Sequence, residues 1–546
     1  MREIVIDIET DMTASQIWCA VTKDLETGEV NVWTEAEKLQ SYLAEESILI
    51  GHNVIGFDVP VLKKHWNMKI DNHQLKDTLV MSRLLNPILE NGHSLRAWGH
   101  RLGNYKDDFK GFDDGLNEEM VSYCKQDVEV TALLYKRLSR DLLEWGYSSD
   151  LEHRVAIAVK EQEENGFKLD VKKAIFLLAD WRKRLAEIEE ELQTVFRPLV
   201  IERVSEKTGK RLKDKIEVFN PGSRKQIAER LMALGWKPKK HTEKGTVIVD
   251  EGTLQTIDIP QAKLIAEYLL LQKRLAQVES WIDHADHIDR VHCKVITNGA
   301  VTGRMTHSKP NLAQVPRVGN PFGKECRECW TVEDGNVLVG IDASGIELRL
   351  LAHFMRDEDY INEILSGDIH TKNMIAAGLT NRDQSKTFIY AFLYGAGPAK
   401  IGQIVGGGER EGRKLIDSFL KNTPSLQKLR EKVSRLAQRG WLPGLDGRRL
   451  IVRSQHAALN TLLQGSAAVV MKEALIGLTN KMKESTIVGS FVANVHDEWQ
   501  IETTKEFAGS VGEAGIQAIQ QAGLTFGLRC PLDGEYKTGT NWAATH

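Results

Sequence analysis

Two groups of acidic residues in this chain have the spacing that divalent metal ions require. In the first group, Asp7 and Glu9 lie two positions apart in the apolar run IVIDIET. If this run is a strand, both carboxylates point to one face and the flanking Ile6 and Ile8 point to the other. Two like charges held this close cost stability unless a cation lies between them, so the pair predicts a metal site.

The other members of the first group follow in order: Asp58 in HNVIGFD, then Tyr123 and Asp127 in YCKQD. The four-residue spacing of Tyr123 and Asp127 places both on one side of a helix. Together with Asp7 and Glu9, the group offers the carboxylates that two Mg²⁺ ions need when waters and phosphate oxygens complete their coordination. This arrangement suits phosphodiester hydrolysis, with Tyr123 orienting the attacking water.

The order DxE, NxxxFD, YxxxD resembles the DEDD 3′–5′ exonuclease family of the tyrosine type. The resemblance implies an RNase H-like α/β domain with a mixed sheet that degrades DNA from its 3′ end. The alternative interpretation is a set of surface acids on an unrelated α/β domain.

The second group of acids lies in the C-terminal half. Asp342 ends the apolar run 337–341 and begins DASGIELR, whose small residues allow a polyphosphate to approach the backbone. Asp497 lies in NVHDEWQIE, where His496, Asp497 and Glu498 separate two apolar runs as the turn of a hairpin does. Asp342 and Asp497 are therefore candidate ligands for a second pair of metal ions.

Between these two acids, RDQSKTFIYAFLYG carries Arg382, Lys386, Tyr390 and Tyr394 at intervals of four. On a helix these residues share one face. The cations offer charge for a triphosphate, and the rings offer flat surfaces for a base. An amphipathic helix with solvated cations is the usual interpretation of such a pattern, but the position between two metal-binding segments favours a nucleotide site.

DASGIELR, the Arg-x3-Lys-x7-Tyr-Gly pattern and VHDE resemble motifs A, B and C of family A DNA polymerases. Further segments resemble replicative polymerases of short-tailed bacteriophages: NGAVTGRMTHSKPNLAQVP, GDIHTKN, KTFIYAFLYGAG, HAALNTLLQGSA and NWAATH. The resemblance covers nearly the whole chain. It implies a DNA-directed DNA polymerase that extends primer 3′ ends with dNTPs, proofreads in a separate exonuclease site and replicates a phage genome.

By this resemblance, Asp342 and Asp497 hold two Mg²⁺ ions, in addition to two in the exonuclease site, and Mn²⁺ can substitute for them. Arg382, Lys386 and His370 contact the triphosphate of the incoming nucleotide, where negative charge develops. Lys386 also protonates the leaving pyrophosphate.

The resemblance implies further roles around the sugar, the base and the DNA. Glu347 occupies a steric-gate position that excludes ribose. Tyr390 governs tolerance of sugars that lack a 3′-hydroxyl, and Tyr394 stacks near the templating base. Minor-groove contacts with primer and template come from Arg304, Asn460, Gln464 and His496. Glu498 neighbours the metal pair without an assigned role as a ligand.

The implied fold is an α/β exonuclease domain joined to a right-hand polymerase with a palm of antiparallel sheet plus helices, a helical thumb and helical fingers. Hydrophobic periodicity predicts helices over 151–193, interrupted at Asn165, and over 261–282. The expected domains are the exonuclease at 1–147, the connecting helix and thumb at 148–295, the palm at 296–355 and 445–546, and the fingers at 356–444.

Composition narrows the class of protein. A chain of 546 residues with a net charge of −4 is too long for a single binding module, and its charge alone does not indicate nucleic acid. Six cysteines indicate reduced thiols rather than a disulfide framework, and Cys326 and Cys329 lack the second pair that a zinc site needs. The sequence start lacks a leader, so we expect a cytoplasmic protein without membrane association, in a bacterial host if it is viral.

Two competing hypotheses are a nuclease of the RNase D type with a helical nucleic-acid-binding tail and a non-enzymatic DNA-binding scaffold. The palm motifs argue against the first, and the intact acids argue against the second. The expected partners are primer–template DNA and dNTPs, and the expected state is a monomer. Phage relatives recruit a host thioredoxin through a basic thumb insertion. Residues 191–217 are basic but too short for it, so we expect no dependence on thioredoxin. We also expect no 5′-nuclease domain.

Overall fold

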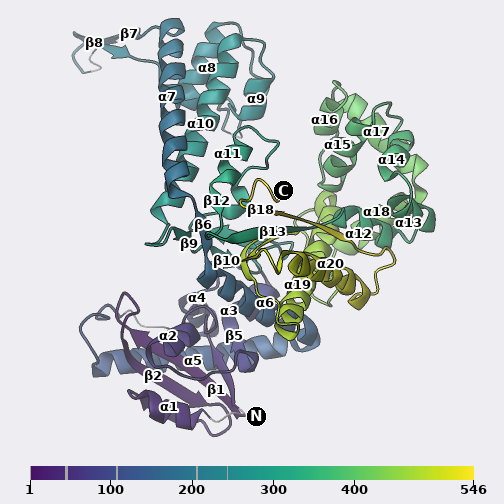
Figure 1. Cartoon of the computed structure of the whole chain (residues 1–546). Helices are drawn as coiled ribbons and strands as arrows, with labels where there is room; N and C mark the ends of the chain where they lie inside the picture. The colour runs from purple at the N-terminus through teal and green to yellow at the C-terminus, as the bar shows by residue number, and fades with distance from the viewer. Residues whose placement is uncertain (1, 44–46, 106–108, 205–206, 243) are drawn as a thin grey trace.

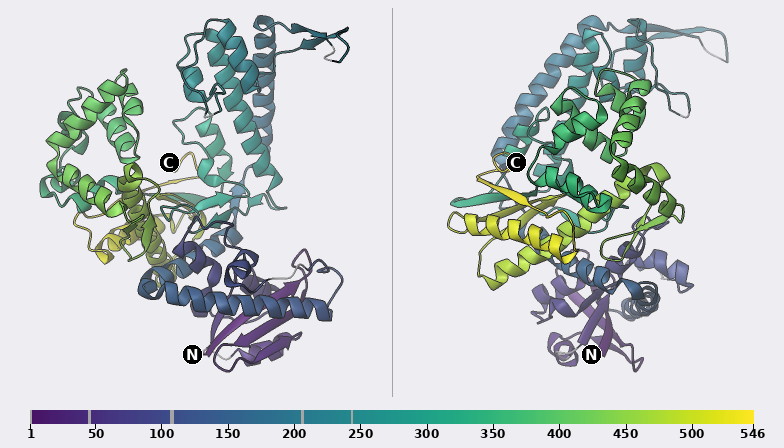
Figure 2. Two further views of the ribbon diagram at one scale, coloured as in Figure 1. Left: turned by 180° about the vertical axis from the view of Figure 1, so that it is seen from behind. Right: turned by 90° about the vertical axis from the view of Figure 1, so that its right-hand side faces the viewer.

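A computed structural model describes residues 2–43, 47–105, 109–204, 207–242 and 244–546 (Figure 1). The N-terminal α/β part lies at one end of the molecule, below a central antiparallel sheet with its helices. Two helical arms rise from that central part, as the views from behind and from the side also show (Figure 2). This arrangement agrees with the expected fold, an α/β domain joined to a right hand.

The N-terminal part is built on a five-stranded mixed sheet of order β3-β2-β1-β4-β5, in which β1 pairs antiparallel with β2 and parallel with β4. Its strands are β1 Arg2–Thr10, β2 Ile17–Asp24, β3 Val30–Trp33, β4 Ser47–Gly51 and β5 Leu75–Asp77. Its helices are α1 Ala36–Tyr42, α2 Asp58–His65, η1 Asn72–Gln74, α3 Thr78–Leu85, α4 Leu95–Leu102, α5 Glu118–Asp141 and η2 Leu143–Trp145.

The central strand β1 is buried on both faces, which explains its apolar sequence. Ile4, Ile6 and Ile8 pack into one hydrophobic cluster, while Val5 joins a second cluster with Cys124 of α5. Because side chains alternate along a strand, residues 7 and 9 share the face of Val5. The two carboxylates therefore face α5.

A connecting helix and a long arm follow. The predicted break at Asn165 is confirmed, because α6 Gly146–Asn165 ends there and Gly166 has a φ of +64°, which favours glycine. The arm consists of α7 Val171–Val195 and α10 Pro260–Asp283, with α8 Arg224–Ala233 and α9 Glu251–Gln255. A two-stranded hairpin, β7 Leu199–Val204 with β8 Arg211–Glu217, projects from the end of α7 (Figure 1).

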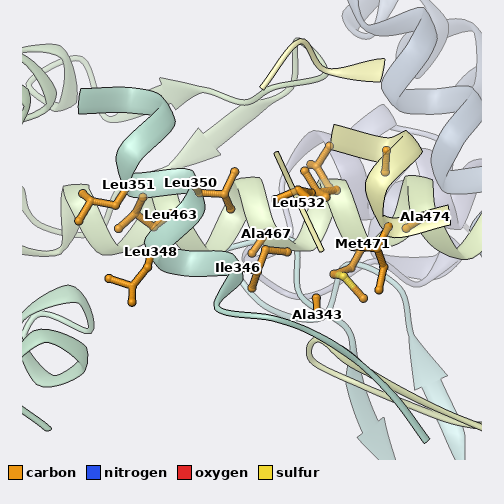
Figure 3. Close-up of a cluster of buried hydrophobic side chains, with 14 of the residues drawn as sticks. Ala343, Ile346, Leu348, Leu350, Leu351, Leu463, Ala467, Met471, Ala474 and Leu532 are labelled. Atoms are coloured by element: carbon orange, nitrogen blue, oxygen red, sulfur yellow. The ribbon is translucent and has the colours of Figure 1, made fainter. Parts of the chain in front are cut away.

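The central sheet has the order β16-β17-β13-β18 and is antiparallel throughout. It comprises β13 Asn336–Ala343, β16 Ser490–Val495, β17 Glu498–Thr504 and β18 Gly534–Gly539, packed with α12 Ile346–Met355, α19 Ala458–Glu484 and α20 Ala508–Thr525. Figure 3 shows Ile346 and Leu350 of α12 beside Leu463 and Ala467 of α19 in one apolar core. This core sets the position of α12 relative to the sheet.

The second arm contains α13 Glu358–Leu365, α14 Ile369–Ala377, α15 Arg382–Leu393, α16 Pro398–Gln403, α17 Glu409–Asn422 and α18 Pro424–Ala437. Short elements complete the fold: β6 Phe167–Leu169, β9 Arg290–Val291, β10 Lys294–Ile296, β11 Thr306–Ser308, η3 Leu312–Gln314, α11 Gly323–Glu328, β12 Trp330–Thr331, β14 Trp441–Pro443, β15 Arg449–Ile451 and η4 Gln455–Ala457.

Helix α6 joins the N-terminal α/β part to the central part through polar contacts. Glu152 is fully buried and accepts hydrogen bonds or ion pairs at 2.7 Å from both Arg448 and Lys472. One residue further on, the Nε2 atom of His153 accepts a hydrogen bond of 2.8 Å from the backbone N–H of Asp77. Since buried charges are tolerated only when paired, these contacts fix the orientation of the two parts.

Helix α19, extended by η4, spans 455–484 and is long and apolar enough to cross a membrane, with a mean hydropathy of 1.2. However, 83% of its apolar window is buried inside the structure. A buried core helix passes the same test, so this helix is weak evidence for a membrane span.

Candidate active sites

The first acidic group converges where β1, α2 and α5 meet. The ligand atoms of Asp7, Glu9 and Cys124 lie within 4.8 Å of one another. Asp127 lies on α5, three residues after Cys124, and is 4% exposed. The strand and the helix therefore place these side chains together, as the alternation of β1 predicts for the two carboxylates.

Asp58 completes this group from the first position of α2. Its Oδ1 atom accepts a hydrogen bond of 3.2 Å from the backbone N–H of Ile8, which lies between Asp7 and Glu9. Burial raises the pKa of Asp58 to about 7, and the charges of Asp77 and Asp127 add to this effect. A carboxylate in such surroundings is stabilised by a bound cation.

Tyr123 lies on α5 with its ring against Phe109 and Phe112, at centroid distances of 5.6 and 6.0 Å. These aromatic contacts restrict the ring beside the acids. The hypothesis that Tyr123 orients a water stays a prediction.

Two residues of this site were missed by the sequence analysis. Cys124 adds a thiol to the acids, although it stands inside the quoted motif YCKQD. Asp77 is 2% exposed and accepts backbone hydrogen bonds from Asn53 at 2.9 Å and Ile55 at 3.1 Å. Asp77 thus shapes the loop before Asp58, and its position just before α3, where it caps the helix, was the available signal.

The second acidic group lies on the central sheet. Register places Asp342 of β13 between Glu498 of β17 and Glu535 of β18. Asp497 lies in the turn between β16 and β17, and its backbone carbonyl accepts a hydrogen bond of 3.1 Å from the N–H of Ala343. The turn therefore brings the two predicted carboxylates to the same end of the sheet.

Burial raises the pKa of Asp342 to about 8, and the charge of Asp497 is the next cause. Burial also raises the pKa of Asp497 to about 6, followed by the charge of Glu347. The cations Arg304 and Arg317 oppose the shift at Asp497. Hard oxygen ligands with mutually unfavourable charge fit a divalent metal ion.

Both acids line a cavity of about 770 Å³ together with three of the residues predicted on one helical face: Lys386, Tyr390 and Tyr394. Helix α15 begins after Asn381, whose side chain caps it. The rings of Tyr390 and Tyr394 lie 6.4 Å apart at an angle of 24°. The predicted face therefore meets the acids across one cavity.

Arg382 and His370 lie further out on the second arm. Arg382 forms two hydrogen bonds with Asp368, at 2.7 and 3.1 Å, and this contact holds the pKa of Asp368 below its usual value. Burial lowers the pKa of His370, and the charges of Arg382 and Lys386 lower it further. The two residues are close to Lys386, but Arg382 already has an acidic partner that the sequence analysis did not identify.

Glu347 lies between a residue predicted to contact DNA, Arg304, and a residue predicted to contact the nucleotide, Tyr394. Its Oε1 atom accepts hydrogen bonds from Arg304 at 3.2 Å and from the hydroxyl of Tyr394 at 3.1 Å. Arg304 and His496 also line a smaller neighbouring cavity beside α19. Asn460 and Gln464 lie on the first two turns of α19.

Glu498 points to the C-terminal segment. Its carboxylate accepts hydrogen bonds from Trp542 at 2.5 Å and Gln500 at 2.6 Å, and lies 3.2 Å from His546. Burial opposes its ionisation, but the hydrogen bond with His546 and the charge of Arg327 lower its pKa. Glu498 is thus held by protein donors. Arg317, Glu535 and His546 line the same cavity and were missed because they lie outside the three polymerase motifs.

Comparisons with known proteins agree with this geometry. A family model described as DNA polymerase family A matches residues 189–544, and one described as 3'-5' exonuclease matches residues 2–143. The polymerase and exonuclease domains of these families generally use divalent metal ions.

The chain is similar to the DNA-directed DNA polymerases of Escherichia phage T7, at 35% identity, and Enterobacteria phage T3, at 34%, over all of both chains in each case. A solved structure described as the POL domain of Pol1 from M. smegmatis, in complex with DNA primer-template and dNTP, has a TM-score of 0.82 at 19% identity. It covers 99% of this chain and 96% of its own. The chain therefore belongs to the family A DNA polymerases and carries a 3′–5′ exonuclease domain as well as the polymerase domain.

Proposed function

We propose that this chain extends primer 3′ ends at the site of Asp342 and Asp497 and removes mispaired 3′ ends at the site of Asp7, Glu9, Asp58 and Asp127. The observation that carries the proposal is the cavity in which two metal-compatible carboxylates face the Lys386–Tyr390–Tyr394 side of α15. We further propose that it replicates a phage genome in the cytoplasm of a bacterial host.

In the polymerase site, Asp342 and Asp497 would hold two Mg²⁺ ions. When bound, these ions supply activation of the primer 3′-hydroxyl and neutralisation of the leaving pyrophosphate. Lys386 lines the same cavity and is the cation that donates charge, and finally a proton, to that pyrophosphate. Arg382 and His370 extend the positive surface outward, and Arg382 exchanges Asp368 for a phosphate.

Residues near the C-terminal end of α15 and at the start of α12 select the base and the sugar of the nucleotide. Tyr390 and Tyr394 offer their rings for stacking, and Tyr390 governs the acceptance of sugars without a 3′-hydroxyl. Glu347 fills the space beneath the sugar. Because Arg304 and Tyr394 both donate to its carboxylate, Glu347 is held in place and excludes a 2′-hydroxyl sterically.

In the exonuclease site, Asp7, Glu9, Asp58 and Asp127 would hold two further Mg²⁺ ions, and Mn²⁺ can substitute in both sites. Tyr123 orients the water that attacks the terminal phosphodiester. Arg304, Asn460, Gln464 and His496 contact the minor groove of the primer–template in the polymerase site.

We propose that the protein acts as a monomer and without a thioredoxin clamp. The alignment with the T7 enzyme runs over 703 positions, whereas this chain has 546 residues, so the relative contains segments that have no counterpart here. The segment that follows α7 forms the short β7–β8 hairpin, which carries Arg203, Arg211, Lys213 and Lys215. Such cations can hold duplex DNA directly by neutralising phosphates.

A primer–template assay with a 5′-labelled primer and Mg²⁺ tests the proposal. The wild type is compared with Asp497→Ala and Asp7→Ala, with and without dNTPs. We expect Asp497→Ala to lose extension and keep degradation, and Asp7→Ala to show the reverse. Degradation without extension by the wild type would contradict the polymerase assignment, and loss of both activities in either variant would contradict two separate sites.

A further inference from the structure

Cys124 places a thiol among the exonuclease acids. Its Sγ atom lies 3.5 Å from Oδ2 of Asp7, and the ligand atoms of Asp7, Glu9 and Cys124 lie within 4.8 Å of one another. Cys124 is fully buried and Glu9 is 6% exposed, so water competes little for either group. The position follows from the fold, because Asp7 and Glu9 share the face of β1 that packs on α5.

We propose that Cys124 is a metal ligand in the exonuclease site, which thereby binds a thiophilic divalent ion such as Zn²⁺ or Cd²⁺ through one sulfur and two carboxylates. Sulfur is a soft ligand that Mg²⁺ does not take, so the thiol adds affinity for thiophilic ions alone.

The spacing of the atoms supports this coordination. In a tetrahedral zinc site, with a metal–sulfur distance of about 2.3 Å and a metal–oxygen distance of about 2.0 Å, the sulfur and oxygen ligands lie about 3.5 Å apart. The distance between Sγ of Cys124 and Oδ2 of Asp7 is 3.5 Å. The distance between these two atoms therefore matches the ligand spacing of such a site.

The proton balance is simple. The Cys124 thiol donates its hydrogen bond to Asp7, and a metal–sulfur bond forms as this proton leaves for solvent. Three protein ligands leave the fourth tetrahedral position to a water or a phosphate oxygen.

The polymerase site provides an internal contrast. Carboxylates line its cavity, among them Asp342, Asp497 and Glu535, and none of the described residues that line it is a cysteine. A thiophilic ion should therefore distinguish the two sites of one chain.

A Cd²⁺ titration of the metal-free full-length chain, without DNA, tests the proposal through the near-ultraviolet charge-transfer band of cadmium thiolates. We expect one equivalent of Cd²⁺ to produce the band in the wild type. Cys124→Ser should lose it and bind Cd²⁺ roughly tenfold or more weakly. Cys530→Ser, which removes another fully buried thiol, should keep it. A band of equal strength in Cys124→Ser, or none in the wild type, would overturn the proposal.

Asp7→Ala keeps all six cysteines and gives a second test if Cys124→Ser does not fold, which circular dichroism would reveal. Cd²⁺ affinity should fall in this variant too, and unchanged affinity would contradict joint coordination by Asp7 and Cys124. The proposal rests on the proposed exonuclease site, but the readouts are separate. If the wild type binds Cd²⁺ yet does not degrade DNA, the nuclease function fails and the metal site stands.

Discussion

The two acidic centres of this polymerase differ in the groups that surround their clustered carboxylates. In the exonuclease centre, the groups that act on Asp58 are other acids and backbone N–H groups. In the polymerase centre, Arg304 and Arg317 oppose the pKa shift of Asp497, and Lys386 faces the acids across the cavity. The polymerase centre therefore has fixed cations beside its acids, whereas none is among the groups that act on Asp58.

The substrates explain this difference. A phosphodiester at a DNA 3′ end brings little charge, so metal ions alone can neutralise both the substrate and the carboxylates. An incoming triphosphate brings more negative charge, and its transfer leaves a charged pyrophosphate. Under the proposed function, the fixed cations on α15 would supply this additional positive charge.

The largest difference between the two centres is expected when Lys386, the cation of α15 that lines the polymerase cavity, is removed. Lys386→Ala should slow nucleotide incorporation by roughly 10²–10³-fold, because it removes both charge and a proton donor from the leaving group. Rapid-quench measurement of a single incorporation gives the rate.

Degradation by the same Lys386→Ala protein is the control and should stay within about twofold of wild type, since Lys386 belongs to the other centre. Lys386→Arg should retain more activity than Lys386→Ala because its charge remains. Equal losses of extension and degradation in Lys386→Ala would contradict the separation of the two centres.

The second prediction concerns selectivity, which only the polymerase centre needs. Glu347→Ala opens the space beneath the sugar and should reduce discrimination against ribonucleotides by roughly tenfold or more, as loss of a steric block does. The ratio of kcat/KM for a dNTP and its ribonucleotide measures this effect.

Tyr394→Phe is the matched variant, because it removes the hydroxyl that donates to Glu347 and keeps the ring. It should reduce discrimination less than Glu347→Ala does. If Glu347→Ala leaves the ratio unchanged, Glu347 is a structural residue and not a gate.

Much of both centres was predictable because it depends on local periodicity. The alternation of β1 placed Asp7 and Glu9 on one face, and the interval of four on α15 placed Lys386, Tyr390 and Tyr394 on another. These patterns act within one element, so the sequence contains all the information they require.

The missed residues depend on contacts between distant elements. Asp368 meets Arg382 only because α14 and α15 pack together, and Glu535 reaches Asp342 only through the register of β18. Glu498 stands beside the metal acids in sequence, yet Trp542 and other C-terminal donors hold its carboxylate. Such pairings require the tertiary structure, which periodicity does not specify.

A smaller effect concerns stability without metal ions. Burial raises the pKa of Asp342 to about 8 and that of Asp58 to about 7, so both carboxyls keep protons in the folded chain that the unfolded chain has lost. The contribution of these two carboxyls to the free energy of unfolding of the metal-free protein should therefore fall as pH rises from about 4 to about 8. Asp342→Asn and Asp58→Asn should each recover about 1–3 kcal/mol at the upper end of this range and nothing near pH 4.

Calorimetry of the chelated protein across this pH range measures both effects. If the two parts melt separately, Asp58→Asn should act on the exonuclease transition and Asp342→Asn on the polymerase transition. Addition of Mg²⁺ should stabilise the wild type more than either variant. If a variant gains no stability over the wild type between pH 4 and pH 8, the raised pKa of the substituted carboxyl is contradicted.

The smallest effect tests whether the outer cation of α15 is restrained by its acidic partner. Arg382 and Asp368 are both exposed, so their ion pair is weak, and a triphosphate must compete with Asp368 for the guanidinium. Asp368→Asn keeps the helix cap of α14 but removes the charge, and should lower the KM for dNTPs by less than about fivefold while kcat stays unchanged. Arg382→Ala should raise the KM and make the Asp368 substitution silent, since the two residues act as a pair. If Asp368→Asn has an equal effect with and without Arg382, Asp368 acts through the overall electrostatic field of the arm and not through this pair. The exonuclease rate is the control. It involves neither residue and should not change in any of these variants.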